Sequence, residues 1–216
     1  MAGGIMTDGY FETRLAYDHR RTVLWKALWK FYFSRKISAG ECVLELGCGY
    51  GDFINNVTAT KRIAVDQWPQ FPDYLDAGVT AIVSSVTDLS AIPDQTVDFA
   101  FASNLFEHLT VAECEIVLTQ LILKLRPGGR FTLIQPNYRY CSAEYFDDYT
   151  HITAWSHISL ADFLTKNGFV VSKTTPKFLP LTLKSRLPVS ELLIGIFLAS
   201  PIKPFAKQMI IETYKK

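Results

Sequence analysis

The chain has 216 residues, and its 22 Lys and Arg side chains nearly balance 21 Asp and Glu side chains. Apolar residues make up 49% of it, which supplies a buried core and excludes a chain that is disordered throughout. The net charge of +1 argues against a general nucleic-acid binder, but it hides a pattern. Residues 1–40 carry a net charge of +4, residues 41–175 one of −8, and residues 176–216 one of +5.

In chain order, the first predicted element is a helix over about residues 18–37, where apolar side chains recur at three- and four-residue intervals. After it, short apolar runs rich in Val, Ile and Phe alternate with helical or loop segments. Such runs indicate strands buried on both faces, in a parallel sheet with helices on either side. Two more helices are expected at 111–125, stopped by Arg126-Pro127-Gly128-Gly129, and at 159–167, before Gly168. The predicted strands are 42–46, 62–65, 80–86, 97–102, 130–134, 169–174 and 208–214.

The most informative segment is Val43-Leu44-Glu45-Leu46-Gly47-Cys48-Gly49-Tyr50-Gly51-Asp52, where a buried strand runs directly into three glycines. Glycines there let the backbone turn sharply and let a ligand approach closely. We expect a helix directly after this loop, whose N-terminus would offer free N–H groups and a partial positive charge. A dinucleotide-binding loop would need glycine at position 52, which is Asp52 in this chain.

Four later segments accompany the glycine loop in order. Asp66 ends the second predicted strand, 19 residues beyond Gly47, and Ser85-Val86-Thr87-Asp88-Leu89 follows the third. Residues 97–109 hold the fourth strand and the loop after it, and 125–131 form the turn into the fifth. Across residues 43–135 these segments resemble the class I S-adenosylmethionine-dependent methyltransferases. The resemblance is to their bacterial type 11-like branch, which is often found near surface-polysaccharide genes.

The resemblance implies a Rossmann-like three-layer α/β sandwich with a mostly parallel seven-stranded sheet of order 3-2-1-4-5-7-6, its last strand antiparallel. It implies S-adenosylmethionine as cofactor, with Asp66 on the ribose hydroxyls and Asp88 on the adenine amino group. Taken alone, Asp66 could instead be a helix N-cap, and Asp88 could cap its own turn. The residues expected to bind the cofactor are Glu45, Gly47, Cys48, Gly49, Gly51, Asp66, Gln67, Thr87, Asp88, Leu89 and Asn104, together with Tyr10 and Arg14.

Two histidines are candidate catalytic residues, because a methyl acceptor that must lose a proton needs a base. His108 follows the fourth strand, on the loop where acceptors of such enzymes lie. His151 lies in a loop dense in acids and aromatics, where Asp147 or Asp148 could orient its imidazole. Asp147, Asp148 and His151 could in principle bind a divalent metal ion. The resemblance gives no support for a metal site there, and no metal is expected.

We expect residues 1–40 to form an N-terminal lid and helical segment, and residues 41–216 a single cofactor-binding domain. Residues 179–205 form an apolar and basic excursion inside the final hairpin. Its apolar side chains could cover the active site or join the core, form a dimer contact, or anchor the protein at a membrane surface through residues 179–207.

The function expected from the resemblance is methyl transfer from S-adenosylmethionine to a small molecule, with O-methylation of a sugar or glycolipid intermediate the favoured reaction. The alternatives are a catalytically silent scaffold or binding protein with this fold and, with less support, an RNA methyltransferase. We expect no nucleic-acid partner and a monomer or homodimer. The absence of a signal peptide and of an apolar run of 18 residues predicts a cytoplasmic protein, with contact at the inner membrane face as its only membrane association.

Overall fold

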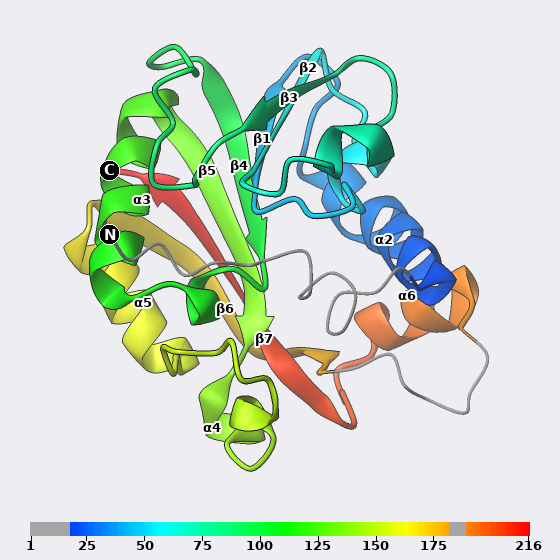
Figure 1. The fold of residues 1–216 in the computed structure, drawn as a ribbon. Coiled ribbons are helices and arrows are strands. Elements are labelled where there is room, and N and C mark those ends of the chain that lie inside the picture. Colours follow the sequence, from blue (N-terminus) through cyan, green and yellow to red (C-terminus); the bar gives the residue numbers. More distant parts are fainter. Residues whose placement is uncertain (1–17, 182–188) are drawn as a thin grey trace.

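A computed structural model describes residues 18–181 and 189–216 of the chain. They form three layers, with a seven-stranded sheet between two layers of helices (Figure 1). The strand order is β3-β2-β1-β4-β5-β7-β6; β1 to β5 are parallel, and β7 runs antiparallel to both β5 and β6. The strands are β1 Cys42–Leu46, β2 Lys61–Asp66, β3 Val79–Val83, β4 Val97–Ser103, β5 Leu125–Pro136, β6 Phe169–Pro180 and β7 Ala206–Lys215. The helices are α2 His19–Phe31, α3 Val111–Lys124, α4 Tyr138–Cys141, α5 His157–Lys166 and α6 Glu191–Ala199, and the expected fold class is confirmed.

The core has two halves, one on each face of the sheet. Helices α3 and α5 cover one face, and α2 and α6 lie against the other (Figure 1). Helix α3 begins at Thr110, whose hydroxyl accepts the Glu113 backbone N–H while the Glu113 carboxylate accepts that of Thr110. Such a capping box fixes where a helix starts, so local sequence determines the entry into this layer.

The order of the strands positions the site. The sheet winds outward from β1 in both directions, with β2 and β3 on one side and β4 and β5 on the other. In an open α/β sheet, ligands bind at the carboxyl ends of the strands where the winding reverses. That place is the edge at which β1 and β4 end, at Leu46 and Ser103.

The prediction of a helix directly after the glycine loop is wrong. The link from β1 to β2 contains turns and one 3₁₀ turn, Ile54–Asn56, and the link from β2 to β3 contains only the 3₁₀ turn Phe71–Tyr74. The first link is short and rich in Gly, Asn and Thr, which are weak helix formers, so it turns back to β2 without building a helix.

Two predicted strands also differ from the structure. The third strand ends at Val83 and lies at the edge of the sheet, where Val83 is 52% exposed. It is not buried on both faces, because none of the described helices covers it. The fifth strand begins at Leu125, so Arg126-Pro127-Gly128-Gly129 belongs to β5, where the register against β4 shifts. A bulge of this kind tolerates the proline, which has no N–H for the ladder.

The final hairpin encloses the predicted excursion. Strands β6 and β7 pair antiparallel, and α6 lies between them in the sequence and packs on α2. A Cβ at Gly195 would lie 2.9 Å from the Phe31 ring, so glycine lets these two helices approach closely. Within the described part of the chain, the helices are all too short or too polar to cross a membrane.

Candidate functional site

The glycine loop follows β1 at the switch point of the sheet. Gly47, Gly49 and Gly51 have φ angles of 65°, 51° and 68°, the left-handed region that only glycine adopts without strain. The Gly47 N–H donates to the Val65 carbonyl at 2.8 Å, which ties the loop to β2. A Cβ at Gly47 would lie 2.9 Å from Leu105 Cδ1, so the chain after β4 closes on the loop from the other side. The loop is thus enclosed between β2 and the chain after β4, with Gly49 and Gly51 buried and Gly47 half-buried.

Asp66 holds this loop in place from the end of β2. Its carboxylate accepts the Gly49 N–H at 2.8 Å and the Trp68 N–H at 2.9 Å. Burial raises the pKa of Asp66, and these backbone hydrogen bonds act in the opposite direction. The bond to Trp68 spans two residues and stabilises a turn, not a helix, so the helix N-cap alternative is wrong.

Glu45 lies beneath the loop within β1. Its carboxylate accepts the Ile54 N–H at 3.0 Å and so fixes the backbone beyond the loop. Burial raises the pKa of Glu45 well above its usual value, and the charges of Asp52 and Asp66 add to this effect. Cys48 is buried beside it, and burial likewise raises the pKa of its thiol well above the usual value, so this cysteine is an inert thiol.

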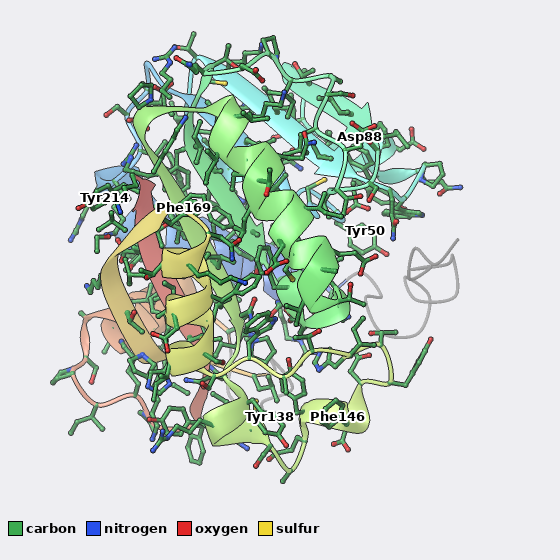
Figure 2. All side chains as sticks on the ribbon, turned by 90° about the vertical axis from the view of Figure 1, so that its left-hand side faces the viewer. Tyr50, Asp88, Tyr138, Phe146, Phe169 and Tyr214 are labelled. Carbon is green, nitrogen blue, oxygen red and sulfur yellow. The ribbon has the colours of Figure 1, made fainter. Side chains whose placement is uncertain are left out.

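The residues after β3 lie at the exposed edge of the sheet. Asp88, which is labelled in Figure 2, lies on the segment after β3. It accepts the Ser90 backbone N–H at 3.0 Å, which is the turn cap weighed for it, and hydrogen bonding to Ser90 lowers its pKa. Thr87 Oγ1 lies 2.8 Å from Ser85 Oγ. Leu89 is fully buried in the core, so only its backbone is placed to meet a ligand. The cofactor roles of Thr87, Asp88, Leu89 and the exposed Gln67 stay predictions.

Asn104 joins three strands where β4 ends. It is one of the described non-glycine residues with a left-handed φ, 49°, and its N–H donates to the Ile134 carbonyl at 2.8 Å. Gln208 Nε2 lies 3.5 Å from Asn104 Oδ1, at the start of β7. Strained backbone of this kind is concentrated at functional sites, which agrees with the expectation for Asn104.

The two candidate catalytic histidines come together beyond β4. The ring centroids of His108 and His151 lie 4.9 Å apart, and one ligand atom each from Glu107, His108 and His151 lies within 4.8 Å of the others. Glu107 is fully buried, and neither carboxylate oxygen has a hydrogen-bond partner among the described residues. The structure therefore joins two residues expected from the sequence to one that was not assigned a role.

Hydrogen bonds to both imidazoles fix their tautomers. His151 Nδ1 lies 2.6 Å from the Tyr145 carbonyl oxygen, which only accepts, so Nδ1 carries the proton. His108 Nδ1 lies 3.2 Å from the Thr150 carbonyl and 3.0 Å from Thr150 Oγ1, whose own proton goes to Asp148 at 2.6 Å. In the neutral form, each ring therefore carries its lone pair on Nε2. Asp148 acts on His108 through Thr150, and the expectation that Asp147 or Asp148 orients His151 stays a prediction.

Burial sets the charge of this cluster. It lowers the pKa of His108 to about 4, and the nearby His151 adds to the effect, so His108 is neutral at pH 7. Burial raises the pKa of Glu107 to about 8, with a further contribution from the charge of Asp148. The signal for Glu107 was present in the sequence, because a charged residue inside the apolar run Leu105–Leu109 needs a reason for its burial.

The expected lid can be followed only in part. Tyr10 and Arg14 lie outside the described residues. Within α2, Arg21 forms an ion pair with Asp52 at 2.7 Å, and the rings of Trp25 and Phe53 meet edge to face at 5.9 Å. The helix before the sheet therefore contacts the segment that leaves the glycine loop.

Comparison with known proteins assigns the class. A family model described as a methyltransferase domain matches residues 17–174. The chain belongs to this family, and the resemblance to the class I S-adenosylmethionine-dependent methyltransferases is confirmed, as is the prediction that the protein is an enzyme. No curated protein matches the chain.

Solved structures share the fold along nearly the whole chain. An S-adenosylmethionine-dependent methyltransferase from Archaeoglobus fulgidus is 20% identical, with 90% of this chain and 94% of that chain covered at a TM-score of 0.66. A geranyl diphosphate methyltransferase in complex with S-adenosylmethionine is 17% identical, with 99% and 93% covered at 0.66. A methyltransferase from Mesorhizobium loti is 14% identical, with 88% and 98% covered at 0.63. At these identities the likeness concerns the fold.

Proposed function

We propose that this methyltransferase transfers a methyl group from S-adenosylmethionine to a hydroxyl group of a sugar or glycolipid intermediate. The observation that carries the proposal is the glycine loop held to Asp66 through the Gly49 N–H at the switch point of the sheet. The chain keeps Glu45, Asp66 and three left-handed glycines together, a costly arrangement that a silent scaffold would have no need to keep.

The loop fits the cofactor, because its three left-handed glycines carry no side chains and a Cβ at Gly47 would collide with Leu105. Gly47, Gly49 and Gly51 would present backbone to the cofactor, and Asp66 would accept hydrogen bonds from its ribose. Asn104 and the backbone at Leu89 would flank it. When bound, the cofactor supplies a methyl group that is already activated on a sulfonium.

The residues of the protein hold the acceptor and remove its proton. Fixing two reactants in line is worth roughly 7–11 kcal/mol in well-oriented cases, and a base adds about 10²–10⁴-fold. The Nε2 atoms of His151 and His108 carry lone pairs, and His151 is the more exposed of the two. We propose that one of these two histidines accepts the proton of the acceptor hydroxyl, with His151 as the first candidate.

The surroundings of the histidines favour a polar acceptor with an apolar face. Tyr145 packs on His151 and on Tyr138, and Tyr138 and Phe146 lie beside one another on the segment after β5 (Figure 2). Phe146 and Tyr149 are exposed. Aromatic faces beside carboxylates and hydroxyls suit a sugar ring, which has both apolar and hydrogen-bonding surfaces.

Calorimetry with S-adenosylmethionine is the first test, followed by a screen of nucleotide sugars and lipid-linked glycans for uptake of labelled methyl. We expect cofactor binding and methyl uptake by one of these acceptors. No binding at millimolar cofactor would overturn the proposed reaction and favour the scaffold alternative. Methyl uptake by transfer RNA or ribosomal RNA alone would support the RNA alternative and exclude a sugar.

A lipid-linked acceptor would also explain the outer surface of α6. Leu192 and Ile196 are 68% and 59% exposed on this helix, and Ile202 and Phe205 after it are 76% and 86% exposed. Residues 176–216 carry a net charge of +5. Exposed apolar side chains in a basic segment favour contact with an anionic membrane surface, so we propose a peripheral contact at the inner membrane face.

A further inference from the structure

We propose that Glu107, His108 and His151 form a binding site for a divalent transition-metal ion. One carboxylate oxygen and two imidazole nitrogens lie within 4.8 Å of one another, at the place where the acceptor is proposed to bind. This inference goes beyond the proposed function, because binding of the ion does not depend on what the acceptor is.

The carboxylate of Glu107 is the first argument. It is fully buried, and neither of its oxygens has a hydrogen-bond partner among the described residues. An isolated carboxylate is costly to bury, and buried charges in proteins are paired or bind metals. The ligand-bearing side chains beside it are those of His108 and His151, whose imidazole nitrogens can share a metal ion with a carboxylate oxygen. A cation between the three groups would bind the deprotonated carboxylate and give it the partner that it lacks among the described residues.

The orientation of the imidazoles is the second argument. A histidine that binds a metal almost always donates its other ring N–H to a carbonyl or carboxylate, which fixes the tautomer and the ring. The Tyr145 carbonyl holds His151 Nδ1 in this way, and Thr150 holds His108 Nδ1 while Asp148 holds Thr150. A hydrogen bond therefore holds the Nδ1 side of each ring, and the lone pair of Nε2 points away from that side.

The donor set selects the kind of metal. Two imidazoles and one glutamate are the ligands of catalytic zinc sites, and imidazole also suits iron and nickel, whereas magnesium and calcium prefer oxygen ligands. Bonds of about 2.0–2.1 Å would place tetrahedral donors about 3.3 Å apart, so side-chain rotation must close the present spacing. Half-buried His151 gives the ion a route from solvent.

Three protein ligands would leave a coordination position for the acceptor. A bound Zn²⁺ lowers the pKa of an oxygen ligand, so it would favour the deprotonated hydroxyl. In the metal-loaded protein the two histidines would then hold the ion and no longer accept the proton themselves.

The test is metal retention by the full chain without cofactor or acceptor. After dialysis against a chelator, we would add Zn²⁺, Mn²⁺ or Mg²⁺ at micromolar concentration, remove excess by gel filtration and measure metal content and the thermal midpoint. We expect about one equivalent of Zn²⁺, a raised midpoint and little Mg²⁺. No retained transition metal, or retention of Mg²⁺ alone, would overturn the inference.

Variants assign the binding to this cluster. Glu107→Gln keeps the shape of the side chain, and we expect it to fold without metal and to bind Zn²⁺ at least tenfold more weakly. Thr150→Val removes the hydroxyl that holds His108, and we expect about 10–100-fold weaker binding. His19→Ala, on an exposed histidine of α2, is the matched control and should bind Zn²⁺ like the wild type. Equal binding by Glu107→Gln and the wild type would contradict the site, while calorimetry with S-adenosylmethionine would still test the methyl transfer separately.

Discussion

At the scale of single residues, Asp66 has two tasks that one carboxylate can perform together. It already accepts two backbone N–H groups, and the cofactor proposal adds the ribose hydroxyls. We predict that Asp66→Ala weakens binding of S-adenosylmethionine at least tenfold, about 1.4 kcal/mol or more, as measured by calorimetry. The loss includes the loop as well as the ribose contact, because Gly49 would lose its acceptor.

A second aspartate separates this effect from a general loss of stability. Asp98 accepts the Cys42 N–H at 2.7 Å, at the amino ends of β1 and β4 and therefore at the opposite edge of the sheet. Asp98→Ala should lower the free energy of unfolding but leave cofactor affinity unchanged. Equal affinity in the Asp66 and Asp98 variants would show that the end of β2 is not at the cofactor.

Glu45 supplies a prediction with a defined sign in pH. Its pKa in the folded protein is raised, so the stability that its protonated form contributes is fully present below the unfolded pKa and is lost as pH rises through the folded pKa. Asp52 and Asp66 add to the shift, and Arg21 opposes it. Glu45→Gln keeps an acceptor for the Ile54 N–H and has no charge to lose.

We therefore expect the stability advantage of Glu45→Gln over the wild type to grow as pH rises from about 4.5, the usual glutamate range. Urea unfolding without cofactor, at a series of pH values, measures it. Stability curves that run parallel at all pH values would mean that Glu45 is not titrating in the folded protein.

At the scale of elements, the glycine loop can be tested apart from its backbone strain. Gly47 and Gly128 have φ angles of 65° and 72°, so alanine at either position costs about 1–2 kcal/mol of strain. A Cβ at Gly128 meets nothing within 4 Å, whereas one at Gly47 lies 2.9 Å from buried Leu105. We predict that both alanine variants lose stability, Gly47→Ala more because of the contact with Leu105, and that only Gly47→Ala loses cofactor affinity, as measured by calorimetry. An equal loss of affinity in Gly128→Ala would contradict this placement of the cofactor.

The helices and strands also show how much of the fold could be predicted from the sequence. The positions of most strands and the start of α3 were predictable, because apolar runs and the capping residues Thr110 and Glu113 act locally. The strand order followed from the family resemblance. The absence of a helix after the glycine loop was not predictable, because a short link can return to β2 through turns as well as through a helix. The exposure of β3 depends on which helices cover the sheet, and no local pattern at Val83 encodes that.

The candidate site was predictable to a similar extent. His108 and His151 were expected, but their contact depends on a turn through Tyr145 and Thr150 that returns the chain to the end of β4. Glu107 is adjacent to His108 in the sequence, and its role emerges only from its burial without a hydrogen-bond partner among the described residues. Spacing along the chain carries no information about such tertiary contacts.

At the scale of the whole molecule, the charge pattern acquires a spatial meaning. Helix α2, from the basic first segment, packs against α6, from the basic last segment, and Lys30 meets Glu191 at 3.4 Å between them (Figure 1). The described helices of the two basic segments therefore adjoin on the α2 and α6 face of the sheet. The outward apolar side chains of α6 lie in that basic surrounding, which is the combination expected at an anionic membrane.

This arrangement predicts that vesicles containing phosphatidylglycerol retain the protein at low salt and that pure phosphatidylcholine vesicles do not, because the attraction is partly electrostatic and salt screens it. Replacing the exposed Leu192 by Glu removes about 1.5–3 kcal/mol of apolar burial, so bound protein should fall about tenfold or more. Ile158→Glu changes an exposed apolar residue of α5, on the opposite face, and should leave co-sedimentation unchanged. If anionic vesicles fail to retain the wild type while light scattering finds a dimer that Leu192→Glu separates, the same side chains form a subunit contact, and the acceptor need not be lipid-linked.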